Sequence, residues 1–199
     1  EIRAKIIAMA KEIQEIAKEE RVLPPQLYFM APGPYDERLL FENNISFVRA
    51  PAGKIRRYFS IANFFDAFKT MIGVIKAVFS VFSIFPDVVF GKGGHGSFPA
   101  LLAARLFRIP VIIHESDSVP GRANIIASKF ARRIAVSYPE AAEFFPKEKT
   151  AFTGNPIRRE VAIPMREGAH DILKLDVTVP VILILGGSQG AALINDAIM

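Results

Sequence analysis

Residues 87–136 read DVVFGKGGHGSFPALLAARLFRIPVIIHESDSVPGRANIIASKFARRIAV, and this stretch decides the fold. It holds two successive cycles in which a short apolar strand is followed by a polar or glycine-rich turn and then by a helix. We expect the strands at 87–90 and 109–113, the turns at 91–97 and 114–121, and the helices at 99–106 and 123–130. Strands that alternate with helices in this way indicate an α/β fold with a parallel sheet and flanking helices.

The sequence before and after this stretch continues the alternation. Residues 2–18 carry apolar side chains three or four positions apart, which predicts a packing helix. Further strands are expected at 26–30, 45–48, 133–136 and 150–153, with a short helix at 35–43. Residues 1–158 are therefore predicted to form one Rossmann-like domain.

A linker and the beginning of a second domain are predicted after residue 158. Residues 159–179 contain Pro164, Gly168 and mixed charges, which indicates a linker that holds one short helix or none. The apolar run at 180–185 is typical of a buried strand, and GGSQGA at 186–191 and a helix at 192–199 follow it. Residues 180–199 are therefore expected to supply the first strand and helix of a second domain of the same kind.

Composition limits the class of protein. The 199 residues are 51% hydrophobic, which is enough for a packed core. There is no cysteine, which excludes disulfides and Cys-based zinc sites, and the start of the chain lacks the apolar core of a signal peptide, so we expect a cytoplasmic protein. The net charge of +5 favours anionic partners but does not choose among them. Asp66, Lys69 and Lys76 interrupt the apolar stretch 59–85, which is therefore not predicted to span a membrane.

The polar and glycine-rich turns of the predicted sheet are expected at one edge. Ligands of open parallel sheets bind outside the carboxyl ends of the strands. Glycine turns let backbone N–H groups approach phosphate oxygens, and the helix that follows adds its positive dipole end. Neither turn is a Walker A loop or a complete GxGxxG pattern, which disfavours nucleotide triphosphatases and NAD enzymes. For either turn alone, a tight connection without a ligand fits equally well, and Lys92 fits a solvated charge better than a phosphate contact.

Several side chains of these turns are candidates for chemistry, each with a structural alternative. His95 could be a general base or a phosphate contact, whereas His114 follows a buried strand and fits a core residue that donates to backbone better. Glu115 and Asp117 could accept sugar or ribose hydroxyls, or could cap the next helix. Arg158 could bind a diphosphate through its guanidinium fork, or could belong to a solvated basic turn.

Four motifs in this order resemble the MurG family of peptidoglycan N-acetylglucosaminyltransferases: GKGGHGS, PVIIHESDSVPGRAN, TGNPIRREV and ILGGSQGAALIN. The likeness extends back through PAGKIRRYFS and covers roughly residues 22–199. It implies a GT-B architecture of two Rossmann-like domains, with the acceptor on the first and most of the UDP-sugar on the second. The transfer of GlcNAc from UDP-GlcNAc would be inverting and would need neither a metal nor another cofactor.

The resemblance also implies site residues. Catalytic roles are implied for His95 and Glu115, and substrate-binding roles for Gly93, Gly94, Asp117, Arg158, Ser188 and Gln189. His95 stands where the family has the Tyr of GGY, and Asp117 stands where it has Asn. No counterpart of the family's first strand and GGTGGH loop precedes the opening helix, and that loop supplies the proposed base. We therefore expect an incomplete chain that is inactive alone.

The partners implied by the resemblance are UDP-GlcNAc, an undecaprenyl-pyrophosphoryl-linked acceptor and the anionic surface of the inner membrane, without nucleic acid. The protein would lie peripherally on the cytoplasmic face of the bacterial inner membrane. Residues 54–85, which are rich in Phe and flanked by Lys and Arg, could contact the inner leaflet or form a buried helix. Two alternatives stay open: a different UDP-sugar glycolipid transferase, and a non-catalytic membrane-binding half of a split GlcNAc transferase.

Overall fold

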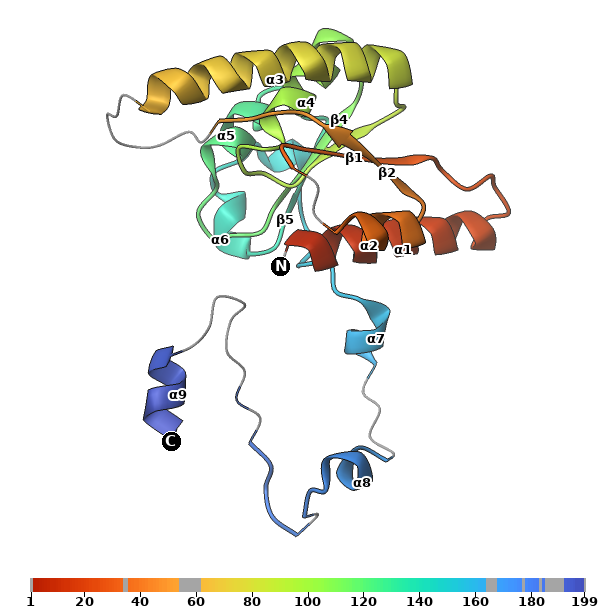
Figure 1. Cartoon of the computed structure of the whole chain (residues 1–199), viewed down its shortest axis with the longest axis vertical. Coiled ribbons are helices and arrows are strands. Elements are labelled where there is room, and N and C mark those ends of the chain that lie inside the picture. Colours follow the sequence, from red (N-terminus) through yellow and green to blue (C-terminus); the bar gives the residue numbers. More distant parts are fainter. Residues whose placement is uncertain are drawn as a thin grey trace.

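The computed structural model describes residues 2–33, 36–53, 62–163, 168–176, 178–182, 184 and 192–198. Its strands are all parallel and lie in two sheets (Figure 1). One sheet pairs β1 (Leu27–Ala31) with β2 (Ile45–Arg49). The other has the order β3 (Val89–Gly91), β4 (Val111–Glu115), β5 (Arg133–Val136) and β6 (Thr150–Phe152). The predicted α/β fold with parallel strands is confirmed, although its strands form two sheets in the described residues.

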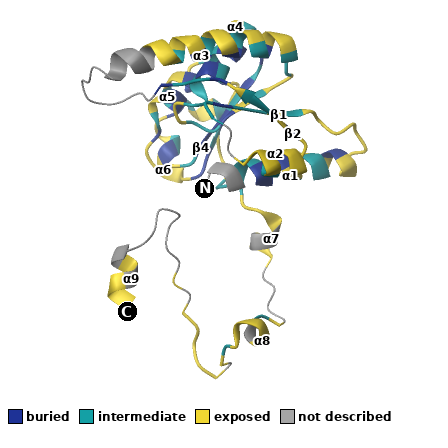
Figure 2. Ribbon diagram, viewed as in Figure 1, coloured by how far each residue is buried: buried dark blue, intermediate teal, exposed yellow. Residues whose placement is uncertain are grey.

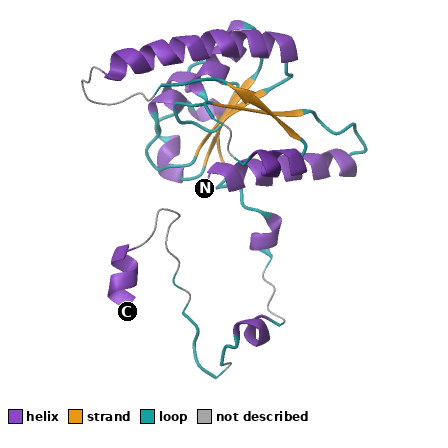
Figure 3. Ribbon diagram, in the orientation of Figure 1, coloured by secondary structure: helices purple, strands orange, loops and turns teal. Residues whose placement is uncertain are grey.

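Helices connect the strands and cover the sheets (Figure 3). They are α1 (Ile2–Glu19), α2 (Glu37–Glu42), α3 (Ala62–Ile84), α4 (Phe98–Leu106), α5 (Arg122–Ser128) and α6 (Pro139–Ala142), with a 3₁₀ turn at Lys147–Lys149 before β6. The later part of the chain contains α7 (Arg159–Ala162), α8 (Ala169–Leu173) and α9 (Ala192–Ile198). No helix among the described residues is both long enough and apolar enough to cross a membrane.

The packing helix predicted at the start of the chain is confirmed as α1. Its buried residues Ile7 and Ala10 contact Leu40 of α2 and Ile45 of β2 in a small core. Helix α2 begins after Asp36, whose carboxylate accepts a hydrogen bond from the backbone N–H of Leu39 at 3.1 Å. Such an N-cap satisfies one of the amide groups that the first turn of a helix leaves without a partner.

The main core lies between the four-stranded sheet and the pair of helices α3 and α4. Ala77 and Val81 of α3 and Leu101 of α4 pack there with Ile113 of β4 and Ile134 of β5. Full burial of a Val, Leu or Ile side chain stabilises the fold by about 1.5–3 kcal/mol. This core holds β3–β6 in place and so fixes the positions of the turns that leave their carboxyl ends.

Strand β4 extends further than the sequence predicted. Its apolar run ends at Ile113, but the strand continues through His114 and Glu115, because these two residues still pair with Ala135 and Val136 of β5. The prediction of a turn beginning at residue 114 was therefore wrong by two positions. The reason is that backbone pairing with a neighbouring strand determines where a strand ends, whereas hydrophobicity shows only which part of it faces a core.

The later part of the chain also differs from the prediction. Residues 180–182 and 184 do not form the expected strand and are exposed (Figure 2). Sheet pairing within the described residues involves only β1–β6, so this apolar run has no strand beside it there. Two short helices, α7 and α8, occupy the predicted linker, and α9 confirms the helix expected after the second glycine turn. That turn, at 186–191, lies outside the described residues.

Candidate ligand site at the carboxyl edge of the sheet

The turns that follow β3, β4, β5 and β6 meet at one edge of the four-stranded sheet, because the four strands are parallel and adjacent. This is the edge at which open parallel sheets bind ligands. The connections there include the glycine turn 92–97, the turn 116–121, the buried Ser137 and the segment 153–158. The predicted gathering of polar residues at this edge is therefore present.

The glycine turn after β3 requires glycine for two reasons. Gly93 and Gly94 have φ angles of +82° and +76°, in the left-handed region that side chains with a Cβ rarely adopt. A Cβ on Gly93 would also lie 2.8 Å from Nδ2 of Asn124 in α5. The hydroxyl of Ser97 donates to the carbonyl oxygens of Gly93 and Gly94, both at 3.1 Å, which closes the turn just before α4 begins.

Glu115 is buried and its carboxylate organises the turn after β4. Oε1 accepts hydrogen bonds from the backbone N–H groups of Ser116 (2.8 Å) and Asp117 (3.1 Å). Oε2 accepts from the backbone N–H of Gly121 (3.1 Å), where α5 begins, and from Nδ2 of Asn124 (2.9 Å). These contacts match the helix-capping alternative for this residue. Its implied catalytic role stays a prediction.

Asn124 is a site residue that the sequence reasoning missed. It is fully buried (0% exposed), and its amide nitrogen also donates to the backbone carbonyl of His114 at 3.2 Å. Its Oδ1 is the buried side-chain acceptor for which no partner occurs among the described residues. Since Asn124 contacts both the glycine turn and Glu115, it couples the turns that leave β3 and β4. A polar residue on the sheet-facing side of α5 is the signal that could have identified it.

His114 is buried (3% exposed) at the centre of the edge. Its Nε2 lies 3.0 Å from the carbonyl oxygen of Gly154 and 3.3 Å from Oγ of Ser137, and its Nδ1 lies 3.3 Å from Oγ of Ser116. Because a carbonyl can only accept, Nε2 carries the proton and Nδ1 accepts from the Ser116 hydroxyl. The predicted core role, with donation to backbone, matches this geometry.

The surroundings of His114 keep it neutral. Burial is the main cause that lowers the pKa of His114 below its usual value of 6.5, and the positive charges of Lys92 and Lys5 lower it further. The hydrogen bond to the Gly154 carbonyl and the charge of Glu115 oppose the shift without cancelling it. A neutral imidazole is the form that can donate from one nitrogen and accept at the other.

The other predicted site residues lie at or near the same edge. His95 and Gly94 are exposed in the glycine turn, Asp117 is exposed in the turn after β4, and Arg158 is exposed at the start of α7. Lys92 donates to Oγ of Ser116, which joins the two turns. Ser188 and Gln189 lie outside the described residues. Across the described part of the chain, no three His, Asp or Glu side chains gather as a metal site would need.

A parallel α/β sheet with a glycine turn, a following helix and polar groups gathered at its carboxyl edge is typical of domains that bind anionic, phosphate-bearing ligands. The sequence narrows this class. Residues 6–136 match the model of the glycosyltransferase family 28 N-terminal domain, and the chain belongs to this family.

Relatives with assigned names support this membership. The chain is 42% identical over 163 residues to the UDP-N-acetylglucosamine–N-acetylmuramyl-(pentapeptide) pyrophosphoryl-undecaprenol N-acetylglucosamine transferase 3 of Bacillus thuringiensis, an alignment that covers 82% of this chain and 46% of the relative. It is 46% identical over 157 residues to the transferase of that name in Treponema denticola, covering 77% and 40% of the two chains. The chain thus spans about half the length of these relatives.

Solved structures agree with the sequence comparison. The MurG crystal structure from Acinetobacter baumannii matches with a TM-score of 0.56 and 26% identity, over 81% of this chain and 43% of that one. The MnaA–UDP structure from S. aureus matches with a TM-score of 0.55 over 86% and 48% of the two chains; at 16% identity, it supports the fold alone. The resemblance to the MurG family and the Rossmann-like fold are therefore confirmed.

Proposed function

We propose that this chain is the acceptor-binding part of an enzyme that transfers N-acetylglucosamine from UDP-GlcNAc to an undecaprenyl-pyrophosphoryl-linked muramoyl-pentapeptide. The product would be lipid II of peptidoglycan synthesis. The identity of 42–46% to transferases named for this reaction is the observation that carries the proposal. The fold supports it, because the turns of the first domain meet at the edge where a phosphate-bearing acceptor would bind.

The chain would have three parts in such an enzyme. Residues 1–158 form the acceptor-binding domain, 159–179 the linker, and 180–199 the beginning of the donor-binding domain, where Ser188 and Gln189 would contact the UDP-sugar. Arg158 is the last residue before the linker, and its exposed side chain is available to a donor diphosphate.

The residues of the carboxyl edge would have different roles in this enzyme. Gly93 and Gly94 place backbone N–H groups close to the acceptor diphosphate, and Asp117 accepts sugar hydroxyls. His95 is exposed and can exchange a proton with a bound hydroxyl group, as a general base must. The Glu115 carboxylate already accepts four hydrogen bonds, so it contributes chiefly by holding the turn that carries Asp117.

A transfer assay tests the reaction. In a chimera, residues 6–163 of this chain replace the matching residues of the Treponema denticola relative, which supplies the rest of the enzyme. We expect transfer of labelled GlcNAc from UDP-GlcNAc to a soluble analogue of the undecaprenyl-pyrophosphoryl-linked muramoyl-pentapeptide. A well-folded chimera that uses diacylglycerol or a plain polyprenyl acceptor would identify a different glycolipid transferase, and one without any transfer would contradict the proposal.

In the same chimera, Arg158→Ala should weaken UDP-GlcNAc binding by at least about 1 kcal/mol, the scale of a lost charge-assisted hydrogen bond.

Helix α3 is the proposed contact with the membrane. Helix α3 buries Ala77 and Val81 against the core, whereas the opposite side of the helix is apolar and exposed (Figure 2). That exposed side comprises Phe68, Ile72, Ile75, Phe79 and Phe82, which recur at alternating spacings of four and three residues. The exposed cations Lys69 and Lys76 flank it. An apolar helix face flanked by lysines fits a peripheral contact with the anionic cytoplasmic leaflet of the inner membrane.

Vesicle flotation tests this contact. We expect the chain to float with phosphatidylglycerol-containing vesicles at low salt and to dissociate as salt rises, because screening weakens the attraction of the lysines. The double variant Phe79→Ser, Phe82→Ser should lose flotation. Phe41→Ser is the control, because Phe41 is even more exposed than Phe79 and Phe82 but lies on α2, away from α3 (Figure 1). Equal loss in both variants, or no flotation of the wild-type chain, would refute the membrane contact.

A further inference from the structure

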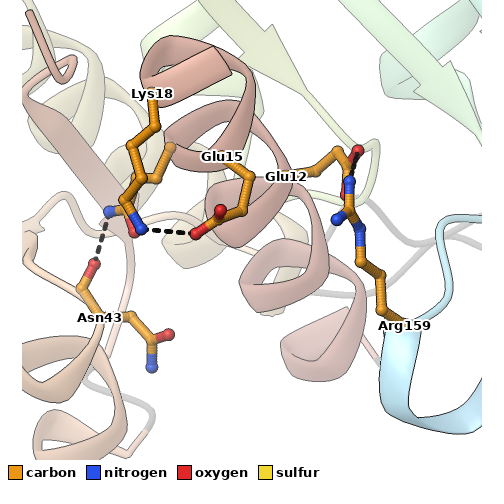
Figure 4. A network of polar contacts seen from close by, with 6 residues as sticks. Glu12, Glu15, Lys18, Asn43 and Arg159 are labelled. Atoms are coloured by element: carbon orange, nitrogen blue, oxygen red, sulfur yellow. Dashed lines mark hydrogen bonds and ion pairs between the residues drawn. The ribbon is translucent and has the colours of Figure 1, made fainter.

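Helix α1 contacts the segment of the chain that follows β6. The carboxylate of Glu12 in α1 accepts two hydrogen bonds from the guanidinium of Arg159, from Nε at 2.8 Å and from Nη2 at 2.7 Å (Figure 4). Four residues before Arg159, Oδ1 of Asn155 accepts a hydrogen bond from Nζ of Lys5 at 2.8 Å. The two contacts join parts of the chain that are 147 and 150 residues apart. We call these two contacts the α1 clamp.

The α1 clamp holds the segment 155–159 at both of its ends. Lys5 and Glu12 are seven residues apart, so they lie on the same side of α1, almost two turns or about 10 Å from each other. The segment also starts from a fixed point, because the backbone N–H of Gly154 donates to the carbonyl oxygen of Val136 in β5 at 3.3 Å. The chain from 155 to 159 is therefore tied to the sheet at its beginning and to α1 along its length.

Arg158 lies between the two contacts of the α1 clamp. Its side chain is exposed, and its backbone forms the N-cap of α7. The clamp uses the side chains of Asn155 and Arg159 and leaves the Arg158 side chain for a ligand. A backbone that is held in place before a ligand arrives loses less conformational entropy on binding. The clamp therefore orders the part of the chain that carries this arginine.

We propose that Glu12 is a positioning residue for the donor substrate. Its ion pair with Arg159 holds the segment 155–159 against α1 and so places Arg158 where it meets the diphosphate of a nucleoside diphosphate sugar. This inference rests on the proposed function for the identity of the donor. Glu12 does not touch the ligand in this arrangement, because it acts through the backbone that Arg158 and Arg159 share.

The exposure of the ion pair sets the size of the expected effect. The side chains of Arg159 and Glu12 are 59% and 45% exposed, and exposed ion pairs change an equilibrium constant by at most about fivefold. The bidentate geometry places this pair among the stronger ones, because two parallel hydrogen bonds fix the orientation of the guanidinium. Such a restraint is too weak to hold a domain together. It is sufficient to bias one short segment, because the competing state is only a local detachment of α7 from α1.

Amide exchange in the 199-residue chain tests the clamp without any ligand. The backbone N–H groups of Ala162 and Ile163 donate to the carbonyl oxygens of Arg158 and Arg159, both at 3.1 Å. NMR measures the exchange of these two amides with solvent. Glu12→Gln should accelerate their exchange by about two- to fivefold, because α7 detaches from α1 more often.

Glu15→Gln is the matched control for this measurement. It removes the same charge one turn later on α1, where Glu15 pairs with Lys18 and not with Arg159 (Figure 4). The exchange of the two amides should stay close to wild type in this variant. In an Arg159→Gln background, Glu12→Gln should add nothing, since the partner is already gone. Wild-type exchange rates in Glu12→Gln, or the same acceleration in Glu15→Gln, would overturn the clamp.

Calorimetric titration of UDP-GlcNAc into the chimera that carries residues 6–163 tests the positioning role. Glu12→Gln should weaken donor binding by about two- to fivefold and leave the KM of the acceptor analogue unchanged, because Arg158 meets only the donor. In an Arg158→Ala background, Glu12→Gln should have no further effect on donor binding, since it acts only through Arg158. An equal loss in that background would assign Glu12 a general structural role and overturn the positioning proposal.

The outcomes separate this inference from the proposed function. A chimera that transfers GlcNAc and binds the donor equally well with and without Glu12→Gln overturns the positioning role and leaves the reaction standing. A chimera that transfers no sugar but loses donor affinity in Glu12→Gln keeps the positioning role and removes the reaction. A well-folded chimera that does not bind UDP-GlcNAc overturns both.

Discussion

Two regions of the chain carry the same pattern of an apolar run, a glycine turn and a helix, yet they adopt different structures. In the sheet region, residues 87–158, the apolar runs are paired strands that share a buried core. In the distal segment, which comprises the described residues of 159–198, short helices form but the apolar run at 180–182 remains exposed and unpaired. The reason for the difference is that a helix forms its hydrogen bonds within its own backbone, whereas a strand needs a neighbouring strand to pair with.

Truncating an isoleucine to alanine in each of the two regions gives the largest expected difference in the free energy of unfolding. Ile113 is 0% exposed in the sheet region, whereas Ile182 is 82% exposed in the distal segment. Ile113→Ala should lower the free energy of unfolding by about 2–5 kcal/mol, because it leaves a cavity in the core, whereas Ile182→Ala should change it by less than about 0.5 kcal/mol. Urea titration followed by circular dichroism measures both. Similar losses in the two variants would mean that the distal segment is packed as tightly as the sheet.

Glycine substitution gives the next largest difference. Gly93 and Gly168 have similar φ angles, +82° and +77°, but only at Gly93 would a Cβ clash with Asn124, since no described residue lies within 4 Å of the Cβ position of Gly168. Gly93→Ala should destabilise the sheet region by about 1–3 kcal/mol through backbone strain, with the clash added to it. Gly168→Ala should leave the unfolding transition of the sheet unchanged. Thermal unfolding measures the melting temperatures of the two variants. Equal shifts of the melting temperature would show that the region around Asn124 adapts to the added Cβ.

A smaller effect is expected from the protonation of His114. Because its pKa lies below the usual value of 6.5, the unfolded chain binds more protons than the folded chain as the pH falls through 6.5. The contribution of neutral His114 to the free energy of unfolding is therefore fully present above about pH 7. It decreases toward lower pH until the folded imidazole also becomes protonated. His114→Gln should remove the slope of the free energy of unfolding against pH between pH 7 and 5.5. Urea titrations at several pH values measure this slope. A slope that persists in His114→Gln would assign it to other groups.

The smallest effect is expected where the distal segment contacts helix α1. Arg159 of α7 forms its ion pair with Glu12 of α1, and both side chains are exposed (Figure 4). Arg159→Gln should therefore hardly change the melting temperature, because exposed pairs contribute little. It should nevertheless raise the pKa of Glu12, which the hydrogen bond from Arg159 lowers below 4.5, and NMR titration of the Glu12 carboxyl can follow this. A large drop in melting temperature would show that the contact between α7 and α1 contributes substantially to the stability of the fold.

Sequence reasoning predicted the elements of the sheet region well for a physical reason. Apolar runs such as 109–113 are buried on both faces of a parallel sheet, so they are continuous and easy to recognise. The same reasoning placed the end of β4 two residues early, because His114 and Glu115 are polar although they continue the strand. It also missed Asn124, whose position opposite Gly93 depends on how α5 packs against the turn after β3.

The sequence by itself determined the alternation of strands and helices, the glycine turn after β3 and the membership of the family, because these depend on residues close together in the chain. Only the tertiary structure decided which polar groups meet. Lys5 joins Asn155 across 150 residues, His114 lies between Ser116 and Gly154, and Asn124 contacts the turn of Gly93. These contacts depend on the order of the strands in the sheet and on the packing of α1 and α5. Local sequence patterns do not encode either property.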